Sequence, residues 1–311
     1  MTAPTHLLTP AMSGLLDRIE RAKPPPFHTL TPDAARAAYA AGAEVLEPPR
    51  AALQRVEDIT VAGRSARLYA PSHDALPVLL YLHGGGFVVG GLETHDSLCR
   101  QLARRSGGAV VALDYRLAPE HRFPAAQDDA WAALQWLAAH ASGLGLDPRR
   151  LAVGGDSAGG TLAAVAAIRA RDHGLALALQ LLITPGTAAF ATHASRHLFA
   201  NGFLLDTTTI EWFFEHTIDR AQRRDWRFAP LEADDLSGVA PACVIVAECD
   251  PLADEGVAYA DKLRLAGVPV HLDLVRGMTH DFIKMGRALK EAAAAQQFAA
   301  DTLRQAWSEN E

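Results

Sequence analysis

Six short apolar segments alternate with helix-forming segments through most of the chain, and this alternation restricts the possible folds more than any other feature. Most of the apolar segments contain few polar residues, as strands buried on both faces do. The six segments are Val78–Leu82, Ala109–Leu113, Leu151–Val153, Leu177–Ile183, Cys243–Ala247 and His271–Val275. Helices are expected between them, near residues 95–106, 125–141, 158–172, 254–266 and 284–305. The pattern predicts an α/β fold with a mostly parallel sheet flanked by helices.

Two parts of the chain do not follow this alternation. Residues 1–50 precede the first strand and predict two helices, near 11–23 and from Thr31-Pro32 to about Pro48, separated by prolines that end the first helix. We interpret them as an N-terminal helical cap segment, followed by an α/β domain over residues 51–311. Within that domain, residues 55–70 predict two alternating strands that form an antiparallel edge.

The second irregular part spans about residues 185–230 and is rich in Phe and Trp. Because α/β sheets bind ligands at the carboxyl ends of their strands, an aromatic insertion there favours a second cap over the ligand site. The alternative is a helix that packs on the edge of the sheet. On the cap interpretation, the side chains expected to line a substrate pocket are Phe87, Phe203, Trp212 and Phe213.

The segment Gly155-Asp156-Ser157-Ala158-Gly159 follows an apolar strand and opens a helix of small residues. In this context a G-x-S-x-G sequence places its serine in a strained turn, with the hydroxyl projecting above the sheet. The helix that follows directs the positive end of its dipole toward the same point. A strand-to-helix turn without chemistry is the alternative, but the context favours Ser157 as a nucleophile.

A second glycine-rich segment, His83-Gly84-Gly85-Gly86-Phe87, follows the apolar strand Val78–Leu82. Glycine lets backbone N–H groups approach a developing negative charge closely. We therefore predict an oxyanion hole made by the N–H groups of Gly84, Gly85 and Ala158. A phosphate-binding loop is disfavoured, since neither G-K-[ST] nor a G-x-G-x-x-G that opens a helix is present. His83 is interpreted as a structural side chain that holds the loop.

A serine nucleophile on this kind of sheet is followed along the chain by its acid and then by its histidine. Asp250 ends an apolar strand, and after it only His271 and His280 remain. His271 falls within a predicted strand, whereas His280 lies in the loop that follows. The order therefore predicts His280 as the base and Asp250 as the acid, with Glu248 as the second choice for the acid.

These segments together resemble the hormone-sensitive lipase family of bacterial carboxylesterases, a branch of the α/β-hydrolases. The matching segments are His83–Phe87, Asp114–Glu120, Phe123–Ala126, Gly155–Gly160, Asp250–Glu255 and His280 with Phe282. The resemblance implies a carboxylesterase that hydrolyses short-to-medium acyl esters through a Ser-His-Asp triad and an acyl-enzyme, with no cofactor and no metal. It also implies an N-terminal helical cap and a homodimer that pairs near Val268–Val275.

The chain departs from the family pattern at two positions. Asp281 stands where the family usually has glycine after the catalytic histidine, and Thr184 stands where an aromatic residue often precedes the proline. The Asp281 carboxylate either faces the site, where it would raise the pKa of His280, or faces solvent. Both departures concern the substrate rather than the type of reaction.

Two alternatives remain at this stage. An amidase or lactonase would use the same triad, whereas a non-catalytic receptor of the same fold would bind a small ligand and lack the histidine that is present here. A nucleic acid partner is disfavoured because the net charge is −7 and no basic stripe is present.

The chain also has no apolar stretch long enough to span a bilayer, which disfavours stable membrane insertion. We see no secretion signal at the N-terminus, and the three cysteines form no C-x-x-C pair. We expect a cytoplasmic enzyme whose partner is a small-molecule ester.

Overall fold

The computed structural model describes residues 4–190 and 193–309. Residues 1–3 of the first predicted cap segment, 191–192 of the second and 310–311 at the end of the α/β domain therefore lie outside the described residues.

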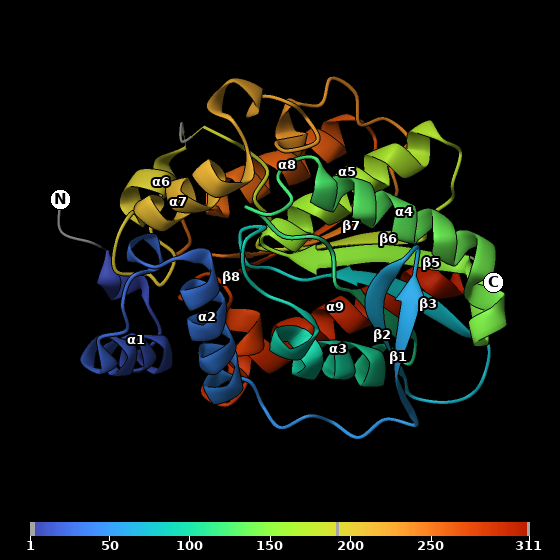
Figure 1. Cartoon of the computed structure of the whole chain (residues 1–311), viewed down its shortest axis with the longest axis horizontal. Coiled ribbons are helices and arrows are strands. Elements are labelled where there is room, and N and C mark those ends of the chain that lie inside the picture. Colours follow the sequence, from blue (N-terminus) through green and yellow to red (C-terminus); the bar gives the residue numbers. More distant parts are fainter. Residues whose placement is uncertain (1–3, 191–192, 310–311) are drawn as a thin grey trace.

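An eight-stranded sheet forms the centre of the molecule, with the strand order β1-β2-β4-β3-β5-β6-β7-β8 (Figure 1). The strands are β1 (Arg55–Val61), β2 (Arg64–Ala70), β3 (Leu76–Leu82), β4 (Ala109–Leu113), β5 (Leu146–Asp156), β6 (Leu179–Ile183), β7 (Ala242–Ala247) and β8 (Val270–Val275). The first two strands pair in antiparallel fashion at one edge, and all pairings from β4 to β8 are parallel. The predicted mostly parallel sheet with an antiparallel edge is confirmed.

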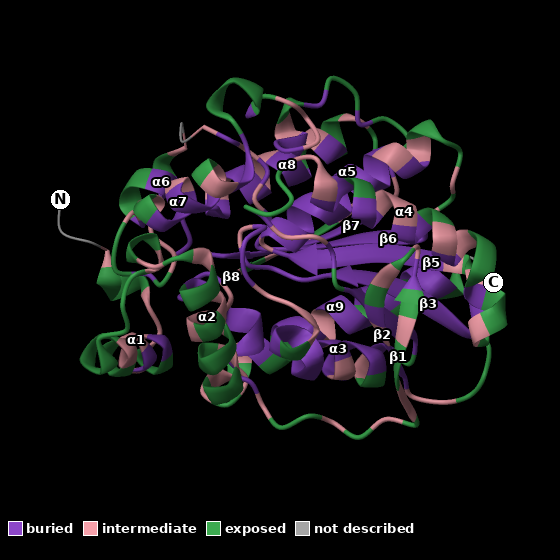
Figure 2. Cartoon of the chain, in the orientation of Figure 1, coloured by how far each residue is buried: buried purple, intermediate pink, exposed green. Residues whose placement is uncertain are grey.

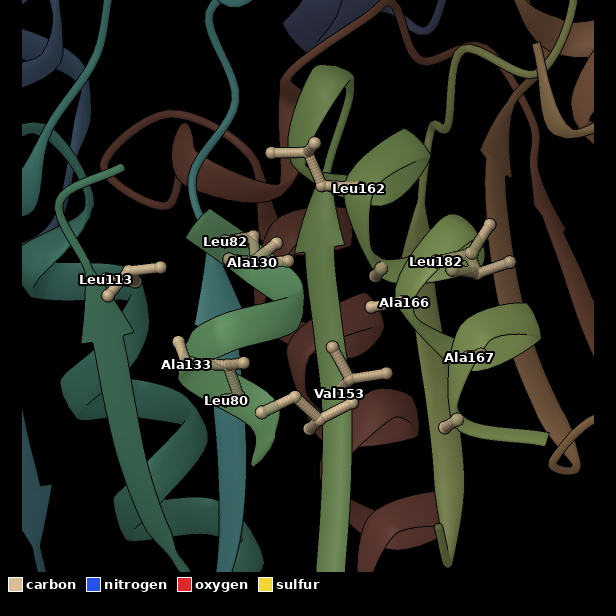
Figure 3. Packing of buried hydrophobic residues seen from close by; sticks show 14 of the residues in the cluster. Leu80, Leu82, Leu113, Ala130, Ala133, Val153, Leu162, Ala166, Ala167 and Leu182 are labelled. Atoms are coloured by element: carbon tan, nitrogen blue, oxygen red, sulfur yellow. The ribbon is translucent and has the colours of Figure 1, made fainter. Parts of the chain in front are cut away.

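Helices cover both faces of this sheet. One face packs against α3 (Leu92–Ser106) and α9 (Lys290–Ser308), and the other against α4 (Ala125–His140), α5 (Ala158–Asp172) and α8 (Ala253–Leu265) (Figure 1). Alternate residues of β3 serve the two layers: Leu80 and Leu82 join the core beneath α4 and α5, whereas Leu79 and Tyr81 join the core beneath α3 and α9. Figure 3 shows the first of these layers. Burial on both faces explains why the central strands are mostly apolar.

The two segments outside the strand–helix alternation lie together at one end of the sheet (left in Figure 1). The first contributes α1 (Pro10–Ala22) and α2 (Pro32–Leu46), and the second contributes α6 (Ala194–Leu198) and α7 (Thr207–Thr217). The hydroxyl of Thr31 accepts a hydrogen bond from the amide of Ala34, as the predicted N-cap requires. Much of the surface of α1 and α2 is exposed, whereas the inner strands β3, β4, β6 and β7 are buried throughout (Figure 2).

The last predicted helix begins later than expected. Residues 284–289 do not form the start of α9, because Phe282–Lys284 is a single 3₁₀ turn and the α-helix begins only at Lys290. Gly286 lies in the intervening turn, where a Cβ would come within 3.3 Å of the Pro48 side chain. Glycine is also a poor helix former, so it ends the run of helix-forming residues that the sequence suggests.

The opposite edge of the sheet is formed by β8, where the predicted homodimer contact lies. Leu274 of this strand is 43% exposed. Dimerisation near Val268–Val275 stays a prediction. No helix within the two described ranges is long and apolar enough to cross a membrane.

The crossing of α5 over the sheet depends on two glycines. A Cβ at Gly159 would overlap the carbonyl oxygen of Leu82, and a Cβ at Gly155 would overlap the same oxygen and the backbone of Gly159. The contacting atoms are backbone atoms, which cannot move aside as a flexible side chain could. Any larger residue must therefore push α5 away from the sheet.

We expect Gly159→Ala to lower the free energy of unfolding by about 2 kcal/mol or more, because a methyl group forced into a packed core is destabilising. Gly143→Ala is the matched control, since a Cβ at Gly143 meets nothing within 4 Å. Denaturant unfolding of both variants measures the difference. Equal stability of the two variants would contradict the close-approach argument.

Candidate active site

Ser157 occupies the sharp turn between β5 and α5. Its backbone dihedrals are φ +53° and ψ −120°, outside the regions that side-chain-bearing residues normally adopt. The amide of Ser157 donates a hydrogen bond of 2.8 Å to the carbonyl of Ile183 on the neighbouring strand β6, which holds the turn in place. Strained backbone of this kind persists only where its surroundings enforce it, and it is common at functional sites.

The side chains of Ser157, His280 and Asp250 form one continuous hydrogen-bonded chain. The distance from His280 Nε2 to Ser157 Oγ is 2.9 Å, and the distance from His280 Nδ1 to Asp250 Oδ2 is 2.7 Å. A carboxylate only accepts hydrogen bonds, so Nδ1–H donates to Asp250 and Nε2 is left to accept the serine proton. Asp250 follows β7 and His280 follows β8, so parallel strands bring the three groups to the same end of the sheet.

Asp250 sets the electrostatics of this chain. Its second oxygen, Oδ1, accepts a hydrogen bond of 2.8 Å from the amide of Leu252, and only 1% of the residue is exposed. Burial by itself would lower the pKa of His280, but the charge and hydrogen bond of Asp250, together with the charges of Asp281 and Asp156, outweigh burial and raise that pKa to about 9. The arrangement therefore stabilises the imidazolium, which makes the neutral form of His280 a strong base.

The glycine-rich loop after β3 corrects one of the predicted oxyanion donors. The amide of Gly84 donates to Asp156 Oδ1 at 3.1 Å, so it points toward a buried carboxylate and not toward Ser157. Gly85, Gly86 and Ala158 all line the cavity that contains Ser157, and their amides have no hydrogen-bond partner among residues 4–190 and 193–309. The candidate donors are therefore Gly85, Gly86 and Ala158, and the prediction of Gly84 was wrong.

Asp156 is a functional candidate that the sequence argument used only as part of a motif. It is completely buried and contacts Tyr81, His95 and the Gly84 amide at distances of 2.6 to 3.1 Å. Burial opposes its ionisation, but the charge and hydrogen bond of His95 hold the pKa of Asp156 well below its usual range. An ionised Asp156 thus ties the glycine-rich loop to the turn that bears Ser157.

The other histidines and acids considered from sequence lie elsewhere. His83 stacks on Tyr115 with ring centroids 4.2 Å apart, and burial lowers its pKa to about 3, so it stays neutral. His271 is part of β8. Glu248 accepts a hydrogen bond of 2.8 Å from the amide of Gly277, whereas His280 pairs with Asp250.

Ser157 and His280 open onto a cavity of about 510 Å³, within the range typical of small-molecule sites. Both cap segments contribute to its walls. The first supplies mainly small and apolar side chains, and the second supplies residues of α6, α7 and the loops beside them. Examples are Ile19, Ala22, Ala38, Gly42, Ala43, Leu205, Ile210 and Phe214.

Two of the four predicted pocket residues line this cavity and two do not. Phe87 and Phe213 are in its wall. Phe203 is fully buried and stacks edge-to-face on Phe199 at 5.1 Å, so it is a core residue. Trp212 packs in a buried cluster with Val88 and Phe213 but does not line the cavity itself.

The period of α7 explains the position of Trp212. Thr209, Ile210 and Phe213 face the cavity, and consecutive residues on a helix lie about 100° apart. Residue 212 therefore faces away from the cavity. Aromatic composition alone could not distinguish these two faces of the helix. The prediction of Phe203 and Trp212 as pocket residues was therefore wrong.

The second cap segment is anchored to the loop that carries Asp250. The hydroxyl of Ser195 donates to the carbonyl of Pro251 at 2.9 Å, and Arg196 forms a buried ion pair of 2.9 Å with Glu255. Arg196 also lines the cavity. Sequence reasoning missed this link, because nothing in the spacing of residues 196 and 255 indicates that they meet.

Comparison with known proteins identifies the family of the chain. A family model described as alpha/beta hydrolase fold matches residues 79–284. Ethyl acetate hydrolase of Pseudomonas putida is 41% identical over 301 residues, covering 92% of this chain and 95% of its own length. Carboxylesterase NlhH of Mycobacterium tuberculosis is 38% identical over 311 residues, covering 95% and 96%.

Solved structures of similar chains have the same fold. An alpha/beta hydrolase named LAE6, from the metagenome of Lake Arreo, superposes with a TM-score of 0.93 at 38% identity, covering 97% of this chain and 99% of the other. An esterase of Pyrobaculum calidifontis superposes with a TM-score of 0.91 at 37% identity, covering 96% and 98%. The chain therefore belongs to the α/β-hydrolase family, in its branch of hormone-sensitive-lipase-like carboxylesterases, and is a serine hydrolase that acts on carboxylic esters.

Proposed function

We propose that this enzyme hydrolyses short-to-medium acyl esters through an acyl-enzyme, with Ser157 as nucleophile, His280 as base and Asp250 as the acid behind it. The hydrogen-bonded chain from Ser157 through His280 to Asp250, open to an apolar cavity, is the observation that carries this proposal. A binding protein without chemistry has no need of a base placed 2.9 Å from a serine hydroxyl.

In the first half-reaction Ser157 Oγ attacks the ester carbonyl carbon, and its proton passes to His280 Nε2. The carbonyl oxygen becomes an oxyanion, and the amides of Gly85, Gly86 and Ala158 are the donors available to it. The bond to the alcohol then breaks, and His280 returns the proton to the leaving oxygen. Loss of one such donor typically costs about 10²–10³ in rate.

In the second half-reaction a water molecule attacks the acyl carbon and gives a proton to His280. The tetrahedral intermediate collapses, the acid leaves, and Ser157 regains its proton from His280. Asp250 holds the imidazole in the same tautomer throughout both halves and stabilises its charge.

The cavity supports an ester with a modest apolar chain. Burial of a chain gains about 0.8 kcal/mol per CH₂, or roughly fourfold in kcat/KM per carbon, until the pocket ends. The cap segments set that limit, because they supply the apolar wall that the sheet lacks. The name of the Pseudomonas putida relative, ethyl acetate hydrolase, agrees with a short acyl group.

An amidase or lactonase would share these groups. Comparison of a butyrate ester with an amide that has the same acyl group would separate the first alternative, and a lactone series would separate the second. Higher kcat/KM on the amide or on a lactone would overturn the preference for open-chain esters.

Removal of the nucleophile should abolish turnover. Ser157→Ala should retain only a residual acceleration of about 10³–10⁴ over the uncatalysed reaction, and Asp250→Asn should lower kcat by about 10⁴ through loss of the correct tautomer. Glu248→Gln is the matched control for Asp250→Asn. Initial rates on a nitrophenyl ester measure all three. A larger loss of kcat in Glu248→Gln than in Asp250→Asn would assign the role of the acid to Glu248.

The pH dependence should follow His280. Only the neutral imidazole accepts the serine proton, so kcat/KM should rise with pH. Because Asp250 and the neighbouring carboxylates raise the pKa of His280 to about 9 against the effect of burial, the midpoint should lie well above the ordinary value of about 6.5. Hydrolysis rates from pH 5 to 10 measure this midpoint, and the rates of the Ser157→Ala variant are subtracted to correct for spontaneous hydrolysis. A midpoint at or below the ordinary value would contradict the assignment.

The acyl-chain limit should respond to α2. A Cβ at Gly42 meets nothing within 4 Å, and Gly42 lines the cavity, so the Cβ of Gly42→Leu fits without a clash and we expect the rest of the side chain to occupy cavity space. We expect the preferred acyl chain to shorten, with a loss of about fourfold in kcat/KM for each carbon that no longer fits. Ala37→Leu, at an exposed position of the same helix, is the control. An unchanged profile for Gly42→Leu would mean that the chain binds elsewhere.

A further inference from the structure

Asp281 follows His280 and adopts a left-handed backbone conformation, with φ at +61°. Glycine occurs readily at such a conformation, and Asp and Asn tolerate it better than other side chains do. This explains how the chain accommodates an aspartate directly after the base. Asp281 thus places a second carboxylate beside His280.

The carboxylate of Asp281 faces His280 and lines the substrate cavity. Its Oδ1 lies 3.8 Å from His280 Nε2, the nitrogen that contacts Ser157. This oxygen is buried and has no hydrogen-bond partner in the described part of the chain. A buried anionic oxygen without a partner is costly, unless an opposite charge forms next to it.

Two side chains hold the other oxygen of Asp281. The hydroxyl of Tyr39, on α2 of the first cap segment, donates to Asp281 Oδ2 at 3.3 Å. The amine of Lys284 donates to the same hydroxyl at 2.5 Å and lies 3.8 Å from Asp281 Oδ2. Burial, together with the charge of Asp281, raises the pKa of Tyr39 well above 10, so the phenol keeps its proton and remains a donor.

We propose that Asp281 is a positioning residue for His280: its carboxylate stabilises the imidazolium that forms as Ser157 attacks, and Tyr39 and Lys284 hold the carboxylate in place. This inference rests on the proposed role of His280 as base. It also assigns the N-terminal cap a part in the chemistry, in addition to its part in forming the cavity wall.

The Asp281 carboxylate stabilises the imidazolium form of His280 more than the neutral form. While His280 is neutral, Nε2 presents a lone pair, and the Asp281 oxygen gains nothing from it. When the serine proton arrives, Nε2 carries an N–H and the ring is positive, so Oδ1 acquires its counter-charge at that moment. An interaction that strengthens only as the reaction proceeds raises kcat.

The charged groups around His280 allow Asp281 to stabilise its imidazolium. The charged groups that act on His280 are Asp250 at 2.7 Å, Asp281 at 3.8 Å, and Asp156 at longer range. Lys284 is the cation beside Asp281, and its contact is to Oδ2, the oxygen that Tyr39 also holds. The remaining oxygen is therefore the one closest to His280. No proton is transferred to Asp281 in this scheme.

The test compares rate against pH for the full-length enzyme and two variants. Asp281→Asn keeps the size of the side chain, tolerates the left-handed backbone and removes the charge, whereas Asp281→Gly removes the whole group. Without the carboxylate the imidazolium is less stable, so the midpoint of the kcat/KM profile should fall by roughly one pH unit. The plateau at high pH should fall by about threefold to tenfold, because His280 becomes a weaker base.

At low pH the lower midpoint of the variants raises their activity, whereas their weaker base lowers it. Below both midpoints the variants should be at least as active as the unaltered enzyme, so the activity ratio should change by about tenfold across the pH range. Tyr39→Phe should show the same pattern with a smaller amplitude, because it removes only the hydroxyl that holds Oδ2. A purely structural role would lower activity by the same factor at every pH.

Asp206→Asn is the matched control. Asp206 is another carboxylate of the cavity wall, and its side chain caps α7 by accepting from the amide of Thr209. Asparagine caps helices about as well as aspartate does. The midpoint of this variant should equal that of the unaltered enzyme, whereas a shift as large as that of Asp281→Asn would show a general effect of charge and overturn the proposal.

The rate of labelling by a fluorophosphonate, measured over the same pH range, separates this inference from the proposed function. Labelling needs Ser157 and His280 but no ester substrate. A labelled enzyme that hydrolyses no ester would overturn the proposed substrate class, and the shift in labelling would still test Asp281. Labelling with the same midpoint in the unaltered enzyme, Asp281→Asn and Asp281→Gly would overturn the role of Asp281.

Discussion

The backbone of α5 passes the end of β3 at a distance that excludes even a methyl group, and the placement of the reacting groups depends on this contact. Gly155 and Gly159 make the approach possible, since a Cβ on either would overlap the carbonyl oxygen of Leu82. The chain must then turn sharply between β5 and α5, which forces Ser157 into its strained backbone conformation. The same approach brings the loop after β3 beside the serine, where Gly85 and Gly86 line the cavity.

Carboxylates with different partners organise the chemistry around that turn. Asp250 holds one nitrogen of His280, and Asp156 holds the amide of Gly84 and thereby the glycine-rich loop. Asp281 lies near the other nitrogen of His280. Each is largely screened from water, so the local arrangement of hydrogen bonds and neighbouring charges decides its effect. Acidic residues that look interchangeable in the sequence therefore differ in what they do.

The sequence predicted the sheet and the Ser157–His280–Asp250 contacts because both depend on local patterns. Apolar segments define the strands, and parallel strands bring their carboxyl ends together, so residues that follow β5, β7 and β8 must meet. The sequence did not predict the directions in which individual groups point. The amide of Gly84 turns toward Asp156, although the spacing of the glycines does not reveal this. Trp212 and Phe213 are adjacent in sequence, yet only Phe213 lines the cavity.

Contacts between the cap segments and the α/β domain were the least predictable feature. Tyr39 meets Asp281, and Arg196 meets Glu255, across long separations in sequence and without any shared motif. These contacts arise from tertiary packing, which no periodicity encodes.

The most direct test of the account is the mass of the enzyme during turnover. A rapidly quenched reaction with a short acyl ester should add the mass of one acyl group, located by peptide mapping on Ser157, and Ser157→Ala should show no addition. Acylation of a different residue, or turnover without any acylated protein under conditions that trap esters, would contradict it.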